Sequence, residues 1–297
     1  MSYIDLDLNL IKTFCVVYEE KGMLAASKKL YVSQPALTSS IKRLEEYLGG
    51  KLFLRTPKGL VPTAEGQEFY EYCQNATKNI DIGINKFMTK SIYDKGVLNI
   101  GSSSTIMRKV LLPFIEYFNK KYPKIVITVT DADSDRLQKL ILRGELDLCI
   151  LNTPIKNYEM FNITKITQTN DCFIASKDFE KDFLTKEELK NYPLILQKRP
   201  STNRDYFEQI CVSNDVHLKP SFELGSFGLI TDFVAKKLGI AFTVENFVQD
   251  DIKNGRVKTI KTDLVFSPRD ICTITSKAST SSIVCDEFIE QLKNYFA

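Results

Sequence analysis

Histidine is almost absent from this chain, and its scarcity excludes whole classes of enzyme. His217 is the only one among 297 residues. Catalysis by Ser-His-Asp or Cys-His therefore requires His217, and nothing near it in the sequence suggests such a role. The glycine patterns GxGxxG and GxxxxGK[ST], which cradle dinucleotides and nucleotide phosphates, are also missing. We therefore predict that the chain is no enzyme and uses no cofactor.

Metal-binding and disulfide frameworks are missing as well. The seven cysteines are scattered without a CxxC pair, which predicts free thiols in a reducing compartment. Asp131, Asp133 and Asp135 imitate the start of a calcium loop. Arg136, however, occupies the required glycine position, and Leu142 occupies that of the bidentate glutamate. We interpret this stretch as a solvated acidic loop and expect no metal site.

Long apolar runs are lacking too, since none approaches the roughly eighteen residues that span a bilayer. The first residues, MSYIDLDLNLIKTF, have neither the basic nor the apolar region of a secretory signal. We therefore expect a cytoplasmic protein with no membrane partner. A hydrophobic content of 43% and a charged content of 26% suit two or three domains with full cores.

What the chain does contain is a local excess of positive charge. The net charge of +3 says little, because nucleic-acid binding depends on where the charge lies. Between residues 21 and 58 the only acids are Glu45 and Glu46. The bases of the same stretch are Lys21, Lys28, Lys29, Lys42, Arg43, Lys51, Arg55 and Lys58. This stretch is where we expect contact with phosphate.

A well-marked helix lies inside the basic stretch. Ser33 is a good N-cap, Pro35 suits the first turn, and Gly49 and Gly50 end the helix. One face is an apolar stripe of Leu37, Ile41, Leu44 and Leu48. The other face carries short polar groups and then cations, the composition that a helix needs to enter a major groove.

The flanking segments complete a winged helix-turn-helix. Residues 24–30, with Ala25 and Ala26, predict a preceding helix that packs closely across the helix capped by Ser33. Residues 51–54 and 60–62 read as two short strands around a basic tip. The alternative is an apolar-striped helical hairpin that only packs against its own domain.

The pattern AAxxxLxVSQPALTxxIxxLExxLGxxLFxRxxxGLVPTxxG, from Ala25 to Gly66, resembles the N-terminal signature of LysR-type transcriptional regulators. The resemblance is strongest over residues 1–90 and continues more weakly to the end. It implies a homodimer or homotetramer that binds an interrupted palindrome of T…A type in double-stranded promoter or operator DNA. It also implies a small-molecule effector that changes DNA bend or spacing, and RNA polymerase as a partner.

The resemblance and the helix pattern together assign the DNA contacts. The residues at the start of the helix, Gln34, Pro35, Thr38 and Ser39, should face base edges and groove walls. The cations Lys42, Arg43 and Lys58 should meet phosphate, and Arg55 should touch the DNA backbone or the minor groove. Family members often carry a long basic or amide side chain at Ser39 or Ser40, so two serines there predict a distinct sequence preference. The predicted contacts are Ser33, Gln34, Pro35, Thr38, Ser39, Lys42, Arg43, Arg55 and Lys58.

A long helix is predicted after the wing, capped by Thr63 and reaching about Tyr93. Its apolar positions recur every three or four residues: Phe69, Cys73, Ala76, Ile80, Ile84 and Phe87. This helix either rests on its own domain or forms the antiparallel dimerisation helix of the LysR-type family. We favour the second interpretation.

From residue 96 the pattern alternates between strands and helices, which predicts α/β structure. Unbroken β-branched strands indicate a mostly parallel sheet with helices on both faces. The chain is expected to cross into a second lobe near Thr164 and to return with strand 271–275 and helix 281–295. This resembles the two-lobed, periplasmic-binding-protein-like effector domain of the family. The predicted domains are 1–63, 64–94 and 95–297, with lobe I at about 95–164 and 267–297 and lobe II at about 165–266.

The effector site is expected at the carboxyl ends of strands, beginning with Gly101-Ser102-Ser103-Ser104-Thr105. A helix N-terminus there favours an anionic or zwitterionic ligand, although a plain Ser/Thr cap explains these residues equally well. Lys198, Arg199 and Arg204 are candidates for the cation that meets a carboxylate. The predicted effector contacts are Ser102, Ser103, Ser104, Thr105, Asn152, Thr153, Gln197, Lys198, Ser201, Thr202, Ser226 and Thr243.

Two alternatives stay open at this point. Cys149, Cys172 and Cys211 are candidates for a thiol sensor of the family's peroxide-sensing branch, which needs accessible thiols of low pKa. Buried structural cysteine is the other interpretation of the same residues. The second alternative is a cytoplasmic solute-binding protein, which would share the two-lobed fold. The additional DNA-binding domain argues against it.

Overall fold

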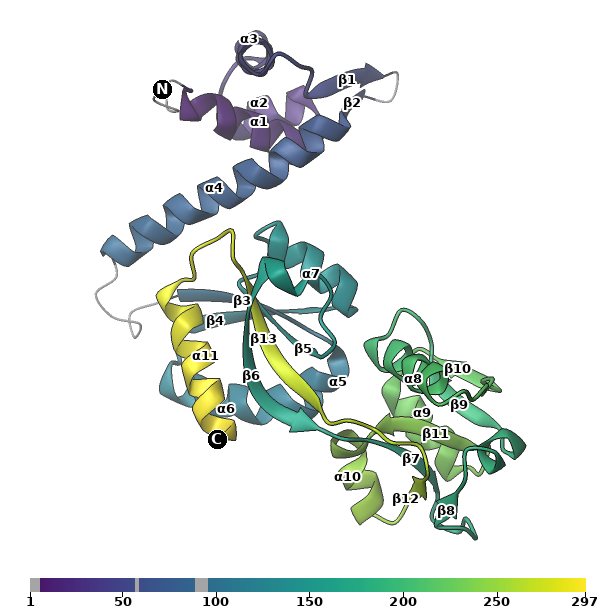
Figure 1. The fold of residues 1–297 in the computed structure, drawn as a ribbon. Coiled ribbons are helices and arrows are strands. Elements are labelled where there is room, and N and C mark those ends of the chain that lie inside the picture. The colour runs from purple at the N-terminus through teal and green to yellow at the C-terminus, as the bar shows by residue number, and fades with distance from the viewer. Residues whose placement is uncertain (1–5, 57–58, 89–95) are drawn as a thin grey trace. The chain divides into compact units, whose positions relative to one another are not determined.

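The computed structural model describes residues 6–56, 59–88 and 96–297 of the chain. These residues form two compact units. The first contains the N-terminal helices, a β-hairpin and one long helix, and the second contains two α/β lobes (Figure 1). Among the described residues, no helix combines the length and apolar character needed to cross a membrane.

The first unit has the predicted winged helix-turn-helix. Its elements are α1 (Leu8–Glu20), α2 (Met23–Leu30), α3 (Gln34–Leu48) and the antiparallel hairpin of β1 (Phe53–Thr56) and β2 (Gly59–Pro62). Leu37, Ile41 and Leu44 of α3 are buried together with Phe14 of α1. Leu48, predicted as the fourth core position, is 40% exposed, because the helix ends beside it at Gly49 with a φ of 71°.

Glu45 ties α3 to the wing. Its side chain is 8% exposed, and its Oε1 accepts hydrogen bonds from the backbone N–H groups of Leu52 (3.0 Å) and Phe53 (3.5 Å). The Nζ of Lys51 lies 2.6 Å from the other carboxylate oxygen. A charged acceptor therefore satisfies backbone donors that would otherwise be buried without partners.

The long helix α4 (Ala64–Met88) begins as predicted at Thr63, whose Oγ1 accepts a hydrogen bond from the Gly66 N–H at 2.9 Å. A Cβ at residue 66 would lie 2.2 Å from the carbonyl oxygen of Leu52, so only glycine lets the helix pass this close to the hairpin. The predicted extension to Tyr93 falls outside the described residues.

The apolar stripe of α4 divides into two parts. Phe69 and Cys73 pack into the core of the first unit. Ile80, Ile84 and Phe87 are 48%, 50% and 90% exposed. The second part of the stripe is therefore an uncovered apolar face, which a helix resting wholly on its own domain would not have.

Lobe I contains a five-stranded sheet of order β4-β3-β5-β13-β6. α6 (Leu112–Lys121) and α11 (Ile283–Phe296) cover one face, with the Phe288 ring 5.0 Å from that of Phe114. α7 (Ser134–Leu142) lies on the other face, where Leu137 and Cys149 meet Gly101 (Figure 1). The strands are β3 (Gly96–Ser102), β4 (Ile125–Asp131), β5 (Leu148–Asn152), β6 (Phe161–Thr169) and β13 (Arg269–Ser276).

The helical segment that follows β3 is interrupted. α5 (Ser104–Ile106) passes through a π-helical turn (Met107–Leu111) into α6 (Leu112–Lys121). Pro113 lies at the start of α6 and has no N–H to donate to the preceding turn. The π turn accommodates that missing hydrogen bond.

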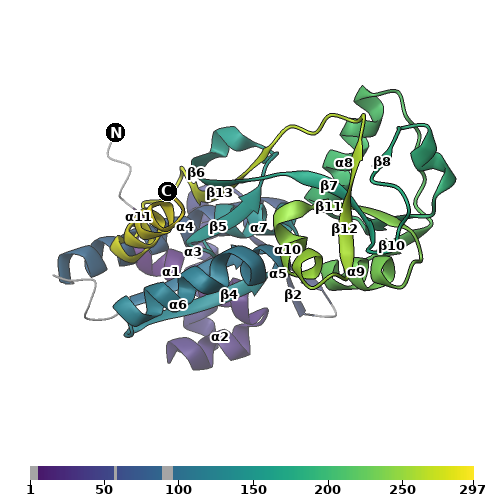
Figure 2. The same cartoon turned by 90° about the horizontal axis from the view of Figure 1, so that it is seen from below.

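Lobe II contains a six-stranded sheet of order β10-β9-β11-β7-β12-β8. α8 (Thr202–Ser213) packs on one face, whereas α9 (Phe227–Ala235) and α10 (Glu245–Lys253) pack on the other (Figure 2). The strands are β7 (Asp171–Ser176), β8 (Phe183–Leu184), β9 (Leu194–Gln197), β10 (Phe222–Leu224), β11 (Ile240–Val244) and β12 (Val257–Thr262).

Both sheets are mostly parallel, as predicted, but each contains one strand that runs against the others. β13 runs antiparallel to β5 and β6, and β7 runs antiparallel to β11 and β12. These strands belong to the two segments that cross between the lobes. The first crossing follows Thr169 at the end of β6 instead of lying near Thr164, in the middle of that strand. A strand buried on both faces reads the same in either direction, so the sequence pattern did not distinguish them.

Candidate DNA-binding surface and effector cleft

The outer face of α3 presents the side chains predicted to meet DNA. Ser33, Gln34, Pro35, Ser39, Lys42 and Arg43 are exposed, and Thr38 is half-buried. The Oγ of Ser33 accepts a hydrogen bond from the Ala36 N–H, so Ser33 also caps the helix. Among the residues that the structure describes, neither Lys42 nor Arg43 forms an ion pair. Two cations are thus available for phosphate on the face opposite the buried stripe.

Two of the predicted DNA contacts, Arg55 and Lys58, belong to the wing. Arg55 lies on strand β1, opposite Leu60 of β2. Lys58, predicted to contact phosphate, lies outside the described residues. On α2 of the helix-turn-helix, the Nζ of Lys29 forms ion pairs with Glu19 at 3.4 Å and Glu20 at 2.8 Å.

A hollow of about 110 Å³ lies between the two lobes. It includes six of the predicted effector contacts: Ser103, Thr105, Asn152, Gln197, Ser201 and Thr202. Two further predicted contacts, Ser104 and Ser226, line a separate hollow beside α9 and α10, together with Thr105. A third hollow, of about 300 Å³, shares Asp133, Ser134, Pro200, Ser201 and Thr202 with the first. We call the first and third hollows together the effector cleft.

The other predicted effector contacts lie elsewhere. Ser102 is fully buried, and its hydroxyl donates to the carbonyl oxygen of Ile150 at 3.1 Å. The Oγ1 of Thr153 accepts a hydrogen bond from the Asp270 N–H at 3.0 Å. Thr243 is fully buried, Lys198 is exposed, and neither is among the residues that line the three hollows.

The sequence analysis missed the apolar wall and the acidic rim of the cleft. The apolar wall includes Phe227 and Phe247, at the starts of α9 and α10. Asp131 and Asp133 lie in the partly exposed acidic stretch that was predicted, and their carboxylates also accept hydrogen bonds at the starts of α5 and α7. The alternation of Asp131, Asp133 and Asp135 at the end of β4 was the available signal.

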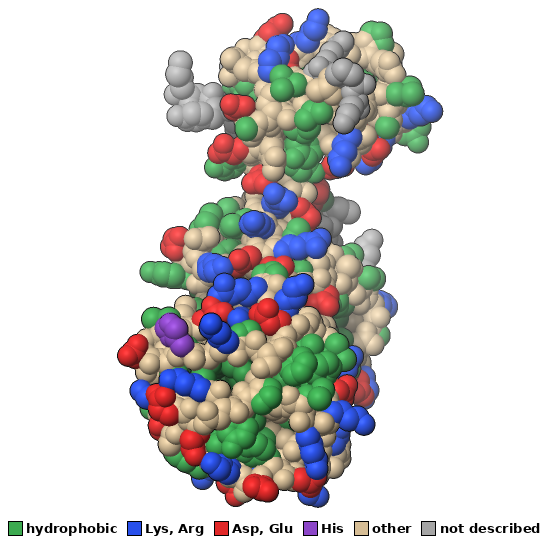
Figure 3. Space-filling view, turned by 90° about the vertical axis from the view of Figure 1, so that its right-hand side faces the viewer, with side chains coloured by type: hydrophobic (Ala, Val, Ile, Leu, Met, Phe, Trp, Pro, Cys, Tyr) green, Lys and Arg blue, Asp and Glu red, His purple; other side chains and the backbone are tan. Residues whose placement is uncertain are grey.

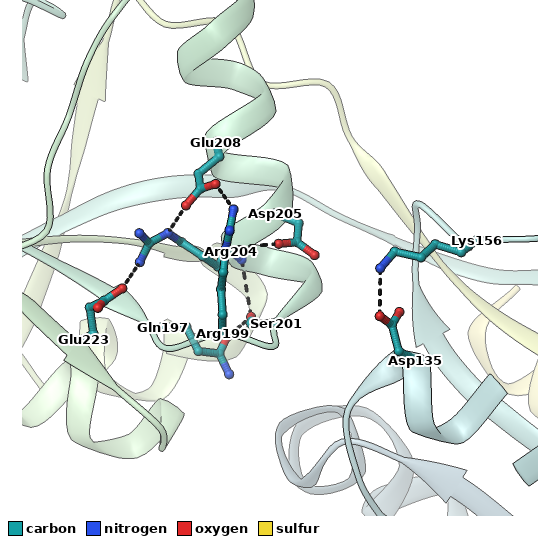
Figure 4. A network of polar contacts seen from close by, with 9 residues as sticks. All are labelled: Asp135, Lys156, Gln197, Arg199, Ser201, Arg204, Asp205, Glu208 and Glu223. Atoms are coloured by element: carbon teal, nitrogen blue, oxygen red, sulfur yellow. Dashed lines mark hydrogen bonds and ion pairs between the residues drawn. The ribbon is translucent and has the colours of Figure 1, made fainter. Parts of the chain in front are cut away.

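The cations expected to meet a carboxylate are already paired within lobe II (Figure 4). Arg204 bonds Glu208 at 2.6 Å and Glu223 at 2.7 Å, and its side chain is 10% exposed. Arg199 also pairs with Glu208, and its Nε lies 3.5 Å from Asp205. On the face seen in Figure 3, Lys and Arg side chains likewise lie among Asp and Glu rather than in a patch of one sign.

A buried ion pair holds the two crossings together. Arg269 opens β13 and Asp171 opens β7, and their side chains are 3% and 0% exposed. The guanidinium binds both carboxylate oxygens, at 2.7 and 2.5 Å, and donates to Asn203 Oδ1 at 2.7 Å. Asn203 also lines the first hollow. A hydrogen-bond path therefore runs from the cleft to the crossing strands.

The cysteines proposed as a thiol sensor are poorly suited to that role. Burial raises the pKa of the Cys149 and Cys172 thiols above their ordinary range, and that of Cys211 to about 11. Such thiols are protonated at neutral pH and are weak nucleophiles. In the first unit, a hydrogen bond from Cys73 lowers the pKa of the Cys15 thiol, although the partial burial of Cys15 acts to raise it. Within the described residues, no cluster of His, Cys, Asp and Glu is arranged to hold a metal ion.

Comparison with known families agrees with this architecture. Residues 8–67 match the model described as a bacterial regulatory helix-turn-helix protein of the lysR family. Residues 93–297 match the LysR substrate binding domain. The chain belongs to the LysR family. It is a transcriptional regulator with a DNA-binding domain and an effector-binding domain, and regulators of this family are transcription factors rather than enzymes.

Individual relatives span nearly the whole LysR-type chain. The regulator AlsR of Bacillus subtilis is 26% identical over 243 residues, or 80% of each protein. CysL of the same organism is 22% identical and covers 97% of both chains. Among solved structures, a full-length OxyR variant from Pseudomonas aeruginosa superposes with a TM-score of 0.75 at 19% identity, over 99% of this chain and 95% of that one. At that identity the superposition supports the fold alone.

Proposed function

We propose that this LysR-type regulator reads operator DNA with α3 and responds to a small molecule in the effector cleft. Gln34, Pro35, Thr38 and Ser39 take the base edges and groove walls. Lys42, Arg43, Arg55 and Lys58 take phosphates, and Ser33 positions the start of the helix. The observation that carries this assignment is the exposed face of α3, whose cations are not consumed by ion pairs in the described structure.

The protein acts as a dimer or a dimer of dimers in the cytoplasm, with RNA polymerase as its downstream partner. The uncovered apolar face of α4 supports self-association through this helix. Two recognition helices then read half-sites about 10 bp apart, or a multiple of that spacing. We place residues 1–63 in the DNA-binding domain, 64–94 in the dimerisation helix and 95–297 in the effector domain.

Effector binding acts on the crossings between the lobes. Ser103, Thr105 and Asn152 lie on lobe I, and Gln197, Ser201 and Thr202 lie on lobe II, so one ligand in the cleft contacts both. A ligand that hydrogen-bonds Asn203 competes with Arg269 for the same amide oxygen. Such a ligand favours one arrangement of the lobes over another, which is the differential binding that a switch requires.

The test separates base reading from phosphate binding. The preferred site is first selected from random DNA, and affinity is then measured by fluorescence anisotropy at several salt concentrations. Gln34→Ala should lose about 1–3 kcal/mol of discrimination between specific and random DNA. Lys42→Ala should weaken both alike and flatten the salt slope by about one unit. Lys293→Ala, an exposed change on α11, serves as the control. An unchanged preferred site in Gln34→Ala rules out base reading by that residue.

A further inference from the structure

The helix ends that face the cleft are already capped by acceptors from the chain itself. The Ser104 N–H at the start of α5 donates to Asp131 Oδ1 at 2.8 Å. The Arg136 N–H of α7 donates to Asp133 Oδ1 at 3.0 Å, and the Arg204 N–H of α8 donates to Ser201 Oγ at 3.3 Å. Carboxylates at two of the three ends also oppose the positive field of the helix. Each cap satisfies one backbone N–H of its helix end, and the two carboxylates offset part of the positive field that would attract an anionic ligand.

The charges that line the cleft are predominantly negative. Asp133 lines both hollows, and Asp135 and Asp205 line the larger one. The only cation among the lining residues of these two hollows is Lys156, which is bound to Asp135 at 2.8 Å. Figure 4 shows Asp205 on α8 across from the pair of Lys156 and Asp135. Because Asp205 lies 3.5 Å from the Nε of Arg199, Asp133 is the lining carboxylate that has no ion pair among the described residues.

Two buried acceptors in the cleft have no hydrogen-bond partner among the described residues. Gln138 is 6% exposed and lines the larger hollow, and its Oε1 is unpaired. Asn152 lines the smaller hollow, and its Oδ1 is buried and also unpaired. A buried acceptor without a donor is costly, so these atoms indicate that a ligand supplies donors. An ammonium group offers three donors and no acceptor.

We infer that the effector is a small molecule with a cationic amino group, which binds at Asp133 and donates toward Asn152 or Gln138. This inference rests on the proposed role of the cleft and narrows its ligand to amines and amino acids. A simple carboxylate belongs to the anionic part of the anionic or zwitterionic class expected from the sequence, and it has no unpaired cation to meet among the described residues that line the two hollows.

The experiment uses matched trios of compounds on the full chain. Each trio contains an amino acid, the amine that lacks its carboxylate and the acid that lacks its amino group, such as L-serine, ethanolamine and 3-hydroxypropionate. Thermal unfolding reports binding, because a ligand of the native state raises Tm with concentration. We expect ammonium-bearing members of at least one trio to raise Tm while the matching acid does not. Asp133→Asn, which keeps an N-capping side chain, should weaken that ligand at least about tenfold.

Two further variants separate the ligand class from the site. Asp178→Asn, an exposed carboxylate outside the cleft, should leave the affinity unchanged. Asn152→Leu tests the cleft without changing its charge. Binding of the acids alone, lost in Asn152→Leu but kept in Asp133→Asn, overturns the ammonium inference and leaves the cleft in place. Shifts that survive both variants, or no shift with any trio, overturn the cleft proposal as well.

Discussion

The cysteine thiols of this protein differ in pKa because their surroundings differ. Cys149 and Cys211 are buried in lobes I and II, where burial raises the pKa of each thiol. Cys15 lies on α1 beside Cys73 of α4 and is only partly buried. The hydrogen bond from Cys73 stabilises the Cys15 thiolate more than burial and Glu19 disfavour it, so the pKa of Cys15 is lowered. The candidate reactive thiol is therefore in the DNA-binding unit.

Thiol labelling tests this difference. At neutral pH we expect iodoacetamide to modify Cys15 before Cys149, Cys172 or Cys211, because alkylation requires the thiolate. Peptide mass spectrometry after short exposures gives the order of labelling. Denatured protein, in which the rates should converge, is the control. Faster labelling of Cys172 or Cys211 in the folded protein would revive the thiol-sensor interpretation of lobe II.

At the scale of elements, the wing is held to the recognition helix by one carboxylate. Glu45 lies on the apolar side of α3 among Leu37, Ile41 and Leu44, where a charged residue is unusual. The sequence pattern places it next to the stripe but gives no reason for it. The backbone N–H groups of Leu52 and Phe53 supply that reason, because they point at Glu45 from the start of the hairpin.

Removing this carboxylate should loosen the wing. Glu45→Ala leaves two buried donors without an acceptor, so we expect the free energy of unfolding to fall by about 1–3 kcal/mol. Urea denaturation followed by circular dichroism measures the change. Glu46→Ala, the exposed neighbour, should stay within about 0.5 kcal/mol of the parent protein. Equal effects of the two substitutions would show that the hydrogen bonds to the wing contribute nothing to stability.

At the scale of the whole molecule, the proposed function requires two copies of the recognition helix. The operator expected from the family resemblance is an interrupted palindrome with two half-sites, and a single winged helix covers one of them. Ile80, Ile84 and Phe87 are exposed apolar residues on one stripe of α4. A second copy of α4 provides a matching apolar face, as in any symmetric association of identical chains.

A charge on this face should separate the subunits. Ile84→Asp places a carboxylate in the proposed interface, and we expect the dissociation constant of the dimer to rise at least about tenfold. Sedimentation velocity across a dilution series measures it. Asp81→Asn, an exposed change on a neighbouring face of α4, is the matched control. Unchanged sedimentation of Ile84→Asp would place the dimer interface on another surface.

The local elements were predictable because their signals are local. Caps such as Ser33 and Thr63, the stripe of α3 and the glycine that ends it depend on neighbours within a few residues. Most strands of the two lobes were recognisable for the same reason. The return of β13 and α11 to the first lobe was also predicted. Strands β6 and β12 give a weaker apolar pattern, since exposed and buried residues alternate along them.

The sequence by itself determined the family, the winged helix-turn-helix, the long helix and the presence of two α/β lobes. Only the tertiary structure decided strand direction, the point where the chain changes lobe and the charge of the cleft. The reason is that these properties depend on pairing between residues far apart in the chain. Glu208 lies one helical turn from Arg204 on α8, but only the fold brings Glu223 to Arg204 and Arg199 to Glu208.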